Sequence, residues 1–310
     1  MSLKIIKSKI RSVHKTRQVT KAMESVSAVK MRKSQKVAFD TRPYAMHAFG
    51  ILKRISGSIE GENYPLMTER DVKNTCIFII TSDKGLAGSL NSAVIKKVVK
   101  EMERDNLTPE NTGFVCLGRK GFEYFSKRGF KIEKYYEQLG EDVSMEMLKD
   151  TSDLLVNLFE DGKYDKFKIF YSNFISTAEQ KPVARTILPV NYDEVKRVVK
   201  YILPKTGKYS EFKGTIDIDT EEDVRAYLFE PGASEILKEL LPTLLNIQIY
   251  YSFLESKASE HSARMVSMKN ASDKADEMAK DLTLVFNKAR QAAITSEISE
   301  ITGGIEAMAK

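Results

Sequence analysis

The segment TSDKGLAGSLNSA, residues 81–93, contains the residue types that could bind a phosphate group. Its two glycines, Gly85 and Gly88, lie where an apolar run gives way to a helical pattern. At such a turn the backbone amides of a helix N-terminus can hold an anion. The spacing matches neither GxGxxG nor GxxxxGK[ST], and no acidic ribose ligand follows at the expected distance. The alternative, which the sequence favours, is a tight turn in which Ser82 or Asp83 caps a helix.

Other residues with chemical potential do not form a recognisable site. GRKG at 118–121 is a second, weaker phosphate-binding candidate. The histidines lack HxxxH or HExxH spacing and fall on predicted long helices: His14, His47 and His261. The cysteines, Cys76 and Cys116, lie in short apolar runs without CxxC spacing, which indicates core positions. We therefore predict no catalytic residues, no metal and no cofactor.

The composition is that of a soluble protein with one or two domains. The chain has 310 residues, of which 42% are hydrophobic, and no stretch approaches the ~20 apolar residues of a membrane-spanning helix. The first residues, MSLKIIKSKIRS, lack the apolar core of a signal peptide. We expect a protein that is made and kept in the cytoplasm.

The C-terminal part of the chain predicts one very long helix with a helical partner. Residues 243–302 contain neither proline nor glycine, and a helix of that length spans roughly 90 Å. Apolar or small residues recur there in alternating steps of four and three, as in a coiled coil. The seam is Ile247, Tyr251, Leu254, Ala258, His261, Met265, Met268, Ser272, Ala275, Ala279, Leu282, Phe286, Ala289, Ala293 and Ser296. His261 is interpreted as a polar position that sets the register.

The N-terminal end predicts the partner helix. Residues 1–42 also lack glycine and proline. The apolar stripe is predicted to run along one face and then shift to another: Leu3, Ile6, Ile10 and Val13, then Val19, Ala22, Met23, Val26 and Val29. Because the two helices flank one central segment, we expect an antiparallel two-stranded coil. The alternative is two amphipathic helices that lie on a globular domain.

The net charge of +6 is unevenly distributed. Residues 1–42 carry twelve Lys and Arg against Glu24 and Asp40, so the rest of the chain is slightly acidic. Nucleic acid is one possible partner for such a basic helix, but single-strand binders add stacking aromatics, and the first 38 residues have none. Acidic protein loops fit better, with solvation of the charges as the simplest alternative.

Between these helices, short β-rich runs alternate with helical ones. The predicted strands are TCIFII (75–80), FVCLG (114–118), FKIEKYY (130–136) and FKIFYSNF (167–174), with helices near 91–104, 124 and 144–160. This alternation predicts a mainly parallel sheet in a doubly wound, Rossmann-like α/β domain. Further strands are expected in VARTILPV, VKRVVKYIL, TIDID and VRAYLFE, between 181 and 229. We predict an N-terminal coiled-coil helix (1–60), a central domain (72–230) and a C-terminal coiled-coil helix (231–310).

Several segments resemble the γ subunit of F-type ATP synthase. They are KAMESVSAVKMRKSQ (21–35), RPYA (42–45), TSDKGLAGSLN (81–91), HSARMVSMKNASDKA (261–275) and LVFNKARQAAITSEISEI (284–301). The resemblance implies a non-catalytic rotor subunit whose coiled coil inserts into a hexamer of three α and three β subunits. The central domain would be the rotor foot on the ε subunit and the membrane ring of c subunits. The rotor would couple ion-driven rotation to ATP synthesis and hydrolysis, and would help to regulate ATPase activity and proton flow.

The resemblance also implies which residues would contact the hexamer. Lys21, Met23 and Arg32 would meet the levers of the β subunits. The second group would meet the catch loops of the catalytic subunits: Arg290, Gln291, Thr295 and Glu297. The structural alternatives are coil core for Met23 and a solvated face for Arg290, Gln291 and Glu297.

The resemblance implies a location as well. Such a subunit is peripheral on the cytoplasmic side of the cell (inner) membrane and reaches the membrane through the complex. The chain departs from the family where GLAGSLN replaces GLCGGLN, and residues 191–225 look longer than in bacterial relatives. The regulatory cysteine pair of chloroplast members has no counterpart, so a bacterial origin is expected. The rival interpretation is a nucleotide-binding α/β enzyme that its helical ends oligomerise.

Overall fold

The computed structural model describes residues 2–56, 64–140, 143–191, 230 and 232–308. The chain forms two compact units. One contains Met1–Ser27 and Arg264–Lys310, and the other contains Ala28–Ala263. Within the described ranges, no helix is both long and apolar enough to cross a bilayer.

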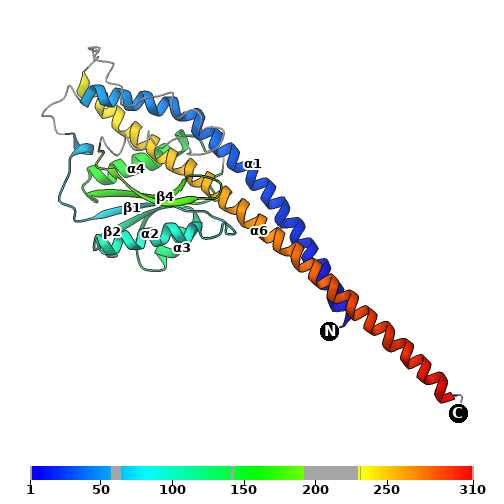
Figure 1. Cartoon of the computed structure of the whole chain (residues 1–310). Coiled ribbons are helices and arrows are strands. Elements are labelled where there is room, and N and C mark those ends of the chain that lie inside the picture. Colours follow the sequence, from blue (N-terminus) through cyan, green and yellow to red (C-terminus); the bar gives the residue numbers. More distant parts are fainter. Residues whose placement is uncertain (1, 57–63, 141–142, 192–229, 231, 309–310) are drawn as a thin grey trace. The chain divides into compact units, whose positions relative to one another are not determined.

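The predicted terminal helices are present (Figure 1). Helix α1 spans Leu3–Ser56 and helix α6 spans Ala233–Met308. Both contain a proline, Pro43 in α1 and Pro242 in α6, and so extend beyond the proline-free runs on which their prediction rested. A proline inside a helix costs about 3 kcal/mol. Buried leucines on both sides of Pro242, Leu241 and Leu244, supply packing that offsets this cost.

The predicted seam of α6 is confirmed over most of its length. Its members from Ile247 to Ala279 are buried, except for the half-buried Met265. Further along the helix, Leu282 and Phe286 are half-buried and Ala293 is exposed. The register of the two antiparallel helices explains why burial decreases, and the ion pair between Arg17 and Asp276, at 3.2 Å, shows this register. This register brings Leu3, the first residue of α1, near residue 290, so the later seam positions have no partner helix.

The predicted seam of α1 is wrong beyond Val13. The structure keeps an unbroken alternation of three and four residues, in which Thr20, Ser27, Met31 and Ser34 are buried. The valines to which the stripe was predicted to shift, Val19, Val26 and Val29, are more than half exposed. The buried positions of α1 therefore follow the helical period and not the hydrophobicity of the residues. Small hydroxyl side chains suit a close helix pair, because each can donate to a carbonyl one turn earlier in its own helix, as Thr20 does to Thr16.

The central segment forms the expected doubly wound sheet. Its strand order is β3-β2-β1-β4-β5; the first four are parallel and β5 is antiparallel to β4. The strands are β1 (Thr75–Ile80), β2 (Thr112–Leu117), β3 (Lys131–Tyr136), β4 (Lys166–Phe174) and β5 (Gln180–Leu188). The helices are α2 (Leu90–Arg104), α3 (Arg119–Ser126) and α4 (Lys149–Glu160), with short 3₁₀ turns at Pro65–Met67 and Glu146–Leu148. Strand β5 contains most of VARTILPV; the other three predicted runs lie outside the described residues.

Two apolar cores cover the two faces of this sheet. Helices α2 and α3 cover one face. The other face packs on α4 and on the parts of α1 and α6 that belong to the same unit (Figure 1). Strands β1 and β2 are buried on both faces, which explains their continuous apolar sequence. Cys76 and Cys116 lie in these strands as predicted, and burial raises the pKa of both thiols.

Candidate functional site

The glycine-rich segment after β1 is held by its own hydrogen bonds. The Asn91 side chain accepts from the backbone N–H of Ser82 and donates to the Ser82 hydroxyl, at 2.9 and 2.7 Å. The Ser82 hydroxyl donates in turn to the Lys84 carbonyl at 2.6 Å. Leu86 and Gly88 adopt positive φ angles of 63° and 57°, which turn the chain sharply into α2. The segment is a closed turn between β1 and α2.

The N-terminus of α3, a possible anion site at GRKG, is occupied by groups of the same turn. The backbone N–H of Arg119 donates to Asp83 Oδ1 at 3.0 Å, and that of Lys120 donates to the Ser82 carbonyl at 3.2 Å. The N–H of Gly121 donates to the Thr81 hydroxyl at 2.9 Å. Asp83 thus caps a helix as the sequence suggested, but the helix is α3 and not the one that follows directly. No amide of this first turn is left for a phosphate.

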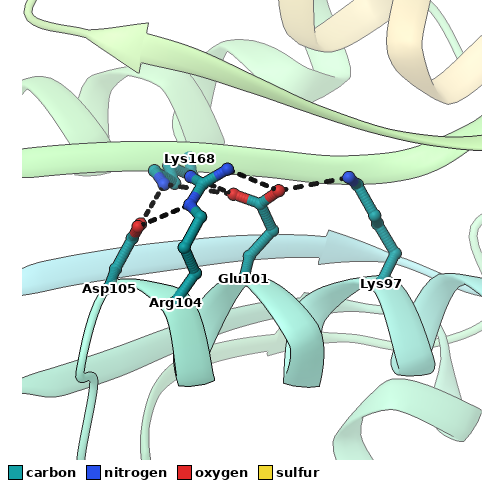
Figure 2. A network of polar contacts seen from close by, with 5 residues as sticks. All are labelled: Lys97, Glu101, Arg104, Asp105 and Lys168. Atoms are coloured by element: carbon teal, nitrogen blue, oxygen red, sulfur yellow. Dashed lines mark hydrogen bonds and ion pairs between the residues drawn. The ribbon is translucent and has the colours of Figure 1, made fainter.

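A second polar cluster ties α2 to β4 (Figure 2). Lys168 on β4 is buried and lies 3.5 Å from Glu101 on α2, and it also forms an ion pair with Asp105. Lys97 and Arg104 hold the same carboxylates from the solvent side. Burial opposes ionisation of Glu101 and Asp105, but the hydrogen bonds and charges of these cations lower the pKa of both. Every charged side chain shown in Figure 2 has an oppositely charged partner within the cluster. We therefore interpret the cluster as a structural contact between α2 and β4.

Removal of the buried cation should destabilise the α/β body. We expect Lys168→Met to cost about 2–3 kcal/mol of unfolding free energy at neutral pH, because two partly buried carboxylates lose their central partner. The control, Lys97→Met, removes a more exposed pair and should cost less than about 1 kcal/mol. Denaturant titration measures both variants. Because the folded-state pKa values of Glu101 and Asp105 are lowered, the stabilisation disappears as the pH falls below about 4.

The residues predicted to contact partner subunits lie on exposed helix faces. Lys21 is exposed and pairs with Glu24 at 3.1 Å, Met23 is half-buried, and Arg32 is exposed in the other compact unit. The C-terminal group is exposed on α6: Arg290, Gln291, Thr295 and Glu297. Arg290 and Glu297 share one face, two turns apart, and Gln291 and Thr295 share another. The register of the helix pair separates this group from Met23 by about 30 Å along the axis.

Two exposed apolar stripes accompany these residues, and the sequence reasoning did not identify them as surfaces. On α1, Val19, Met23 and Val26 follow each other at steps of four and three. On α6, four exposed isoleucines do the same: Ile294, Ile298, Ile301 and Ile305. The sequence contains enough information to find both stripes, because each has the helical period but lies off the seam of its helix. Apolar stripes on a helix surface mark places where other proteins bind.

No group of three or more His, Cys, Asp or Glu side chains in the described part of the chain could hold a metal ion. The described residues instead form paired terminal helices with exposed apolar and charged stripes, and an α/β body whose turns after β1 and β2 are closed by internal hydrogen bonds. Such exposed helical stripes are typical of a stalk-like protein that works through contacts with other chains.

The particular family is shown by comparison with known proteins. The ATP synthase family model (ATP-synt) matches residues 2–308. The ATP synthase gamma chain of Heliobacterium modesticaldum is 40% identical over 98% of each chain, and that of Cytophaga hutchinsonii is 40% identical over 99% of each. The chain belongs to the ATP synthase gamma chain family. The gamma chain is a non-catalytic subunit of ATP synthase, and the catalytic sites lie in the beta subunits.

Solved structures share the fold. One is a chain of the Euglena gracilis mitochondrial ATP synthase (OSCP/F1/c-ring), with a TM-score of 0.63 at 14% identity, covering 99% of this chain and 94% of that one. Another belongs to the central stalk and c-ring of the Tetrahymena thermophila mitochondrial ATP synthase, with a TM-score of 0.58 at 24% identity, covering 82% and 99%. These likenesses agree with a pair of terminal helices and a central α/β domain.

Proposed function

We propose that this chain is the central rotor shaft of a bacterial F-type ATP synthase. The paired helices turn inside a hexamer of α and β subunits, and the α/β domain is the foot that meets the ε subunit and the c-ring. The observation that supports this best is the exposed end of α6. Beyond residue 290 it has no partner from α1 and still carries an apolar isoleucine stripe. An apolar sleeve around such a tip would bury the isoleucines, and it would allow rotation because apolar contacts are not directional.

The shaft acts on the catalytic subunits by unequal contact. A rotor can drive a subunit between open and closed states only if it interacts differently with each. The α1 segment with Val19, Met23 and Val26 on one face and Lys21 on the opposite face combines apolar area with positive charge. Acidic loops of the β subunits would be attracted to it at several angles. Arg290, Gln291, Thr295 and Glu297 form the second contact zone in this proposal.

The location follows from the assembly. The chain would be peripheral, on the cytoplasmic side of the bacterial cell membrane, and held there through the complex. The described turns after β1 and β2 are closed by internal hydrogen bonds, which does not favour the rival, a nucleotide-binding enzyme.

The experiment that tests the function is reconstitution. The chain is co-purified with α and β subunits, and steady ATPase activity is measured with and without it. We expect a complex of three α, three β and one copy of this chain, with turnover that depends on the chain. If the intact subunits do not assemble with it, the rotor proposal is wrong.

A single substitution tests the first contact zone. In the reconstituted complex, Met23→Lys should leave ATP hydrolysis running while fewer ions are pumped per ATP. The added cation forms another attachment of up to ~1 kcal/mol to an acidic loop, enough to shift a two-state ratio about fivefold. The matched control is Met278→Lys, which places the same change at an exposed methionine on α6. Equal ion-to-ATP ratios for the two variants would contradict the placement of Met23.

A further inference from the structure

Glu255 is an ionisable side chain in the contact between α6 and the sheet. Ser252, Glu255, Ser259 and Ser262 follow each other on α6 at steps of three and four, so they share the face turned to β4. The Ser259 hydroxyl donates to the Ser172 carbonyl on β4, and the Ser262 hydroxyl donates to the Thr177 carbonyl, both at 2.9 Å. Glu255 is the charged member of this otherwise neutral row.

The Glu255 carboxyl faces two polar side chains of β4. With its side-chain amide oriented so that the nitrogen faces the carboxyl, Asn173 donates to Oε1 at 3.2 Å and also contacts Oε2. The Tyr171 hydroxyl, also on β4, bonds to the same carboxyl and accepts from Arg185 Nε on β5 at 3.0 Å. The Tyr171 hydroxyl therefore links the guanidinium of Arg185 to Glu255.

A small pocket beside this carboxyl connects it to solvent. Its walls come from α1, β4 and α6 of the same compact unit: Gln35, Ala38, Phe39, Phe174, Leu254, Glu255 and Ala258. The apolar side chains give the carboxyl little solvation, and burial raises its pKa to about 7 against the opposing effect of Arg185 and Tyr171. Because Glu255 itself is half-buried and lines the pocket, protons can exchange there.

We propose that Glu255 is a proton-operated tie between α6 and strand β4. In the ionised state its two oxygens accept from Asn173 and Tyr171. When it takes up a proton, it loses its charge and one acceptor site and gains an O–H to donate, so the hydrogen bonds with these two partners weaken or rearrange. One proton thereby changes how α6 is held on the sheet.

Each element packed against Glu255 contributes other polar groups. On β4 the Tyr171 hydroxyl keeps its proton at neutral pH, because burial raises its pKa. On β5 the facing group is Arg185, which stays charged. From α1 the polar group in the pocket is the neutral Gln35, and on α6 Lys257 and Glu260 pair with each other at 3.7 Å.

The direct test is a carbon-13 NMR titration of the full chain with labelled glutamate carboxyls, between about pH 5 and 9. The Glu255 resonance is the one that Glu255→Gln removes. We expect a midpoint near 7 for Glu255. The resonance of the exposed Glu239 on the same helix, which Glu239→Gln assigns, serves as the reference. Tyr171→Phe removes a donor to the carboxylate and should move the Glu255 midpoint upward. A midpoint in the ordinary range near 4.5, or one that Tyr171→Phe does not move, would overturn the proposal.

A second measurement tests whether α6 responds. The folded-state pKa of Glu255 is raised, so the folded chain binds the extra proton, and stability is lost as the pH rises from about 4.5 to about 7. Amide exchange in residues 250–262, corrected for its intrinsic pH dependence, should therefore increase roughly tenfold between pH 5 and 8, after discounting for partial exposure. The Glu255→Gln variant should show no such increase, and the Glu239→Gln variant should retain it. Identical pH profiles in all three proteins would refute the tie.

Discussion

Gly118→Ala should destabilise the α/β body more than the same change at Gly129 or Gly162, two other glycines at positive φ. A Cβ at position 118 would lie 2.0 Å from the Thr81 carbonyl oxygen and 2.7 Å from its carbon. These are backbone atoms of the turn after β1, which cannot move aside. Gly118 also has φ 93° and ψ 143°, a conformation that side chains rarely adopt.

The expected loss is about 2–6 kcal/mol, because backbone strain and overpacking each cost about 1–3 kcal/mol. For a body of this size, that corresponds to a fall of roughly 4–24 °C in melting temperature. The measurement is a thermal melt of the full chain followed by near-UV circular dichroism, which reports on the aromatic side chains of the sheet.

Gly129→Ala is the matched control. Gly129 has a positive φ of 78°, but an added Cβ meets nothing within 4 Å. Only the backbone strain of about 1–2 kcal/mol should remain. If the two variants melt at the same temperature, the close approach between Gly118 and Thr81 is not what the glycine is needed for.

The second large effect concerns the helix pair. Ala275 is buried on the seam of α6, one residue from the Asp276 that pairs with Arg17. Ala275→Pro removes a helix hydrogen bond and introduces a ring clash worth about 3 kcal/mol or more. We expect ATP synthesis by the reconstituted complex to fall by more than about tenfold, since such a cost depopulates the straight helix by that factor or more.

A truncation provides the comparison. A chain that ends at Ile298 loses residues 299–310 but keeps the seam from Ile247 to Ala279. It should retain more than half of the synthesis rate, because a shaft is held along its whole length. A truncated chain that is impaired as severely as Ala275→Pro would indicate that the tip, and not the stiffness of the pair, carries the coupling.

The regular elements could be predicted because their signals are local. Strand β1 appears as TCIFII with its observed ends, since a strand buried on both faces needs an uninterrupted apolar run. The α6 seam was predictable to Ala279 because apolar and small residues keep the helical period there. The seam of α1 was not, since its buried positions after Val13 include Thr20, Ser27 and Ser34. Such residues do not stand out by hydrophobicity, and only the partner helix makes them interior.

For the candidate site, too, some features could be predicted from the sequence and others could not. The sequence by itself determined the family, the two long helices and the mainly parallel sheet, because these depend on period, composition and local motifs. Tertiary structure decided that Asp83 caps α3, that Lys168 reaches the acidic face of α2, and that Glu255 faces Tyr171 and Asn173. Each of these contacts joins residues more than thirty positions apart. Their distance is set by how the strands and helices pack, and the spacing of residues along the chain does not record it.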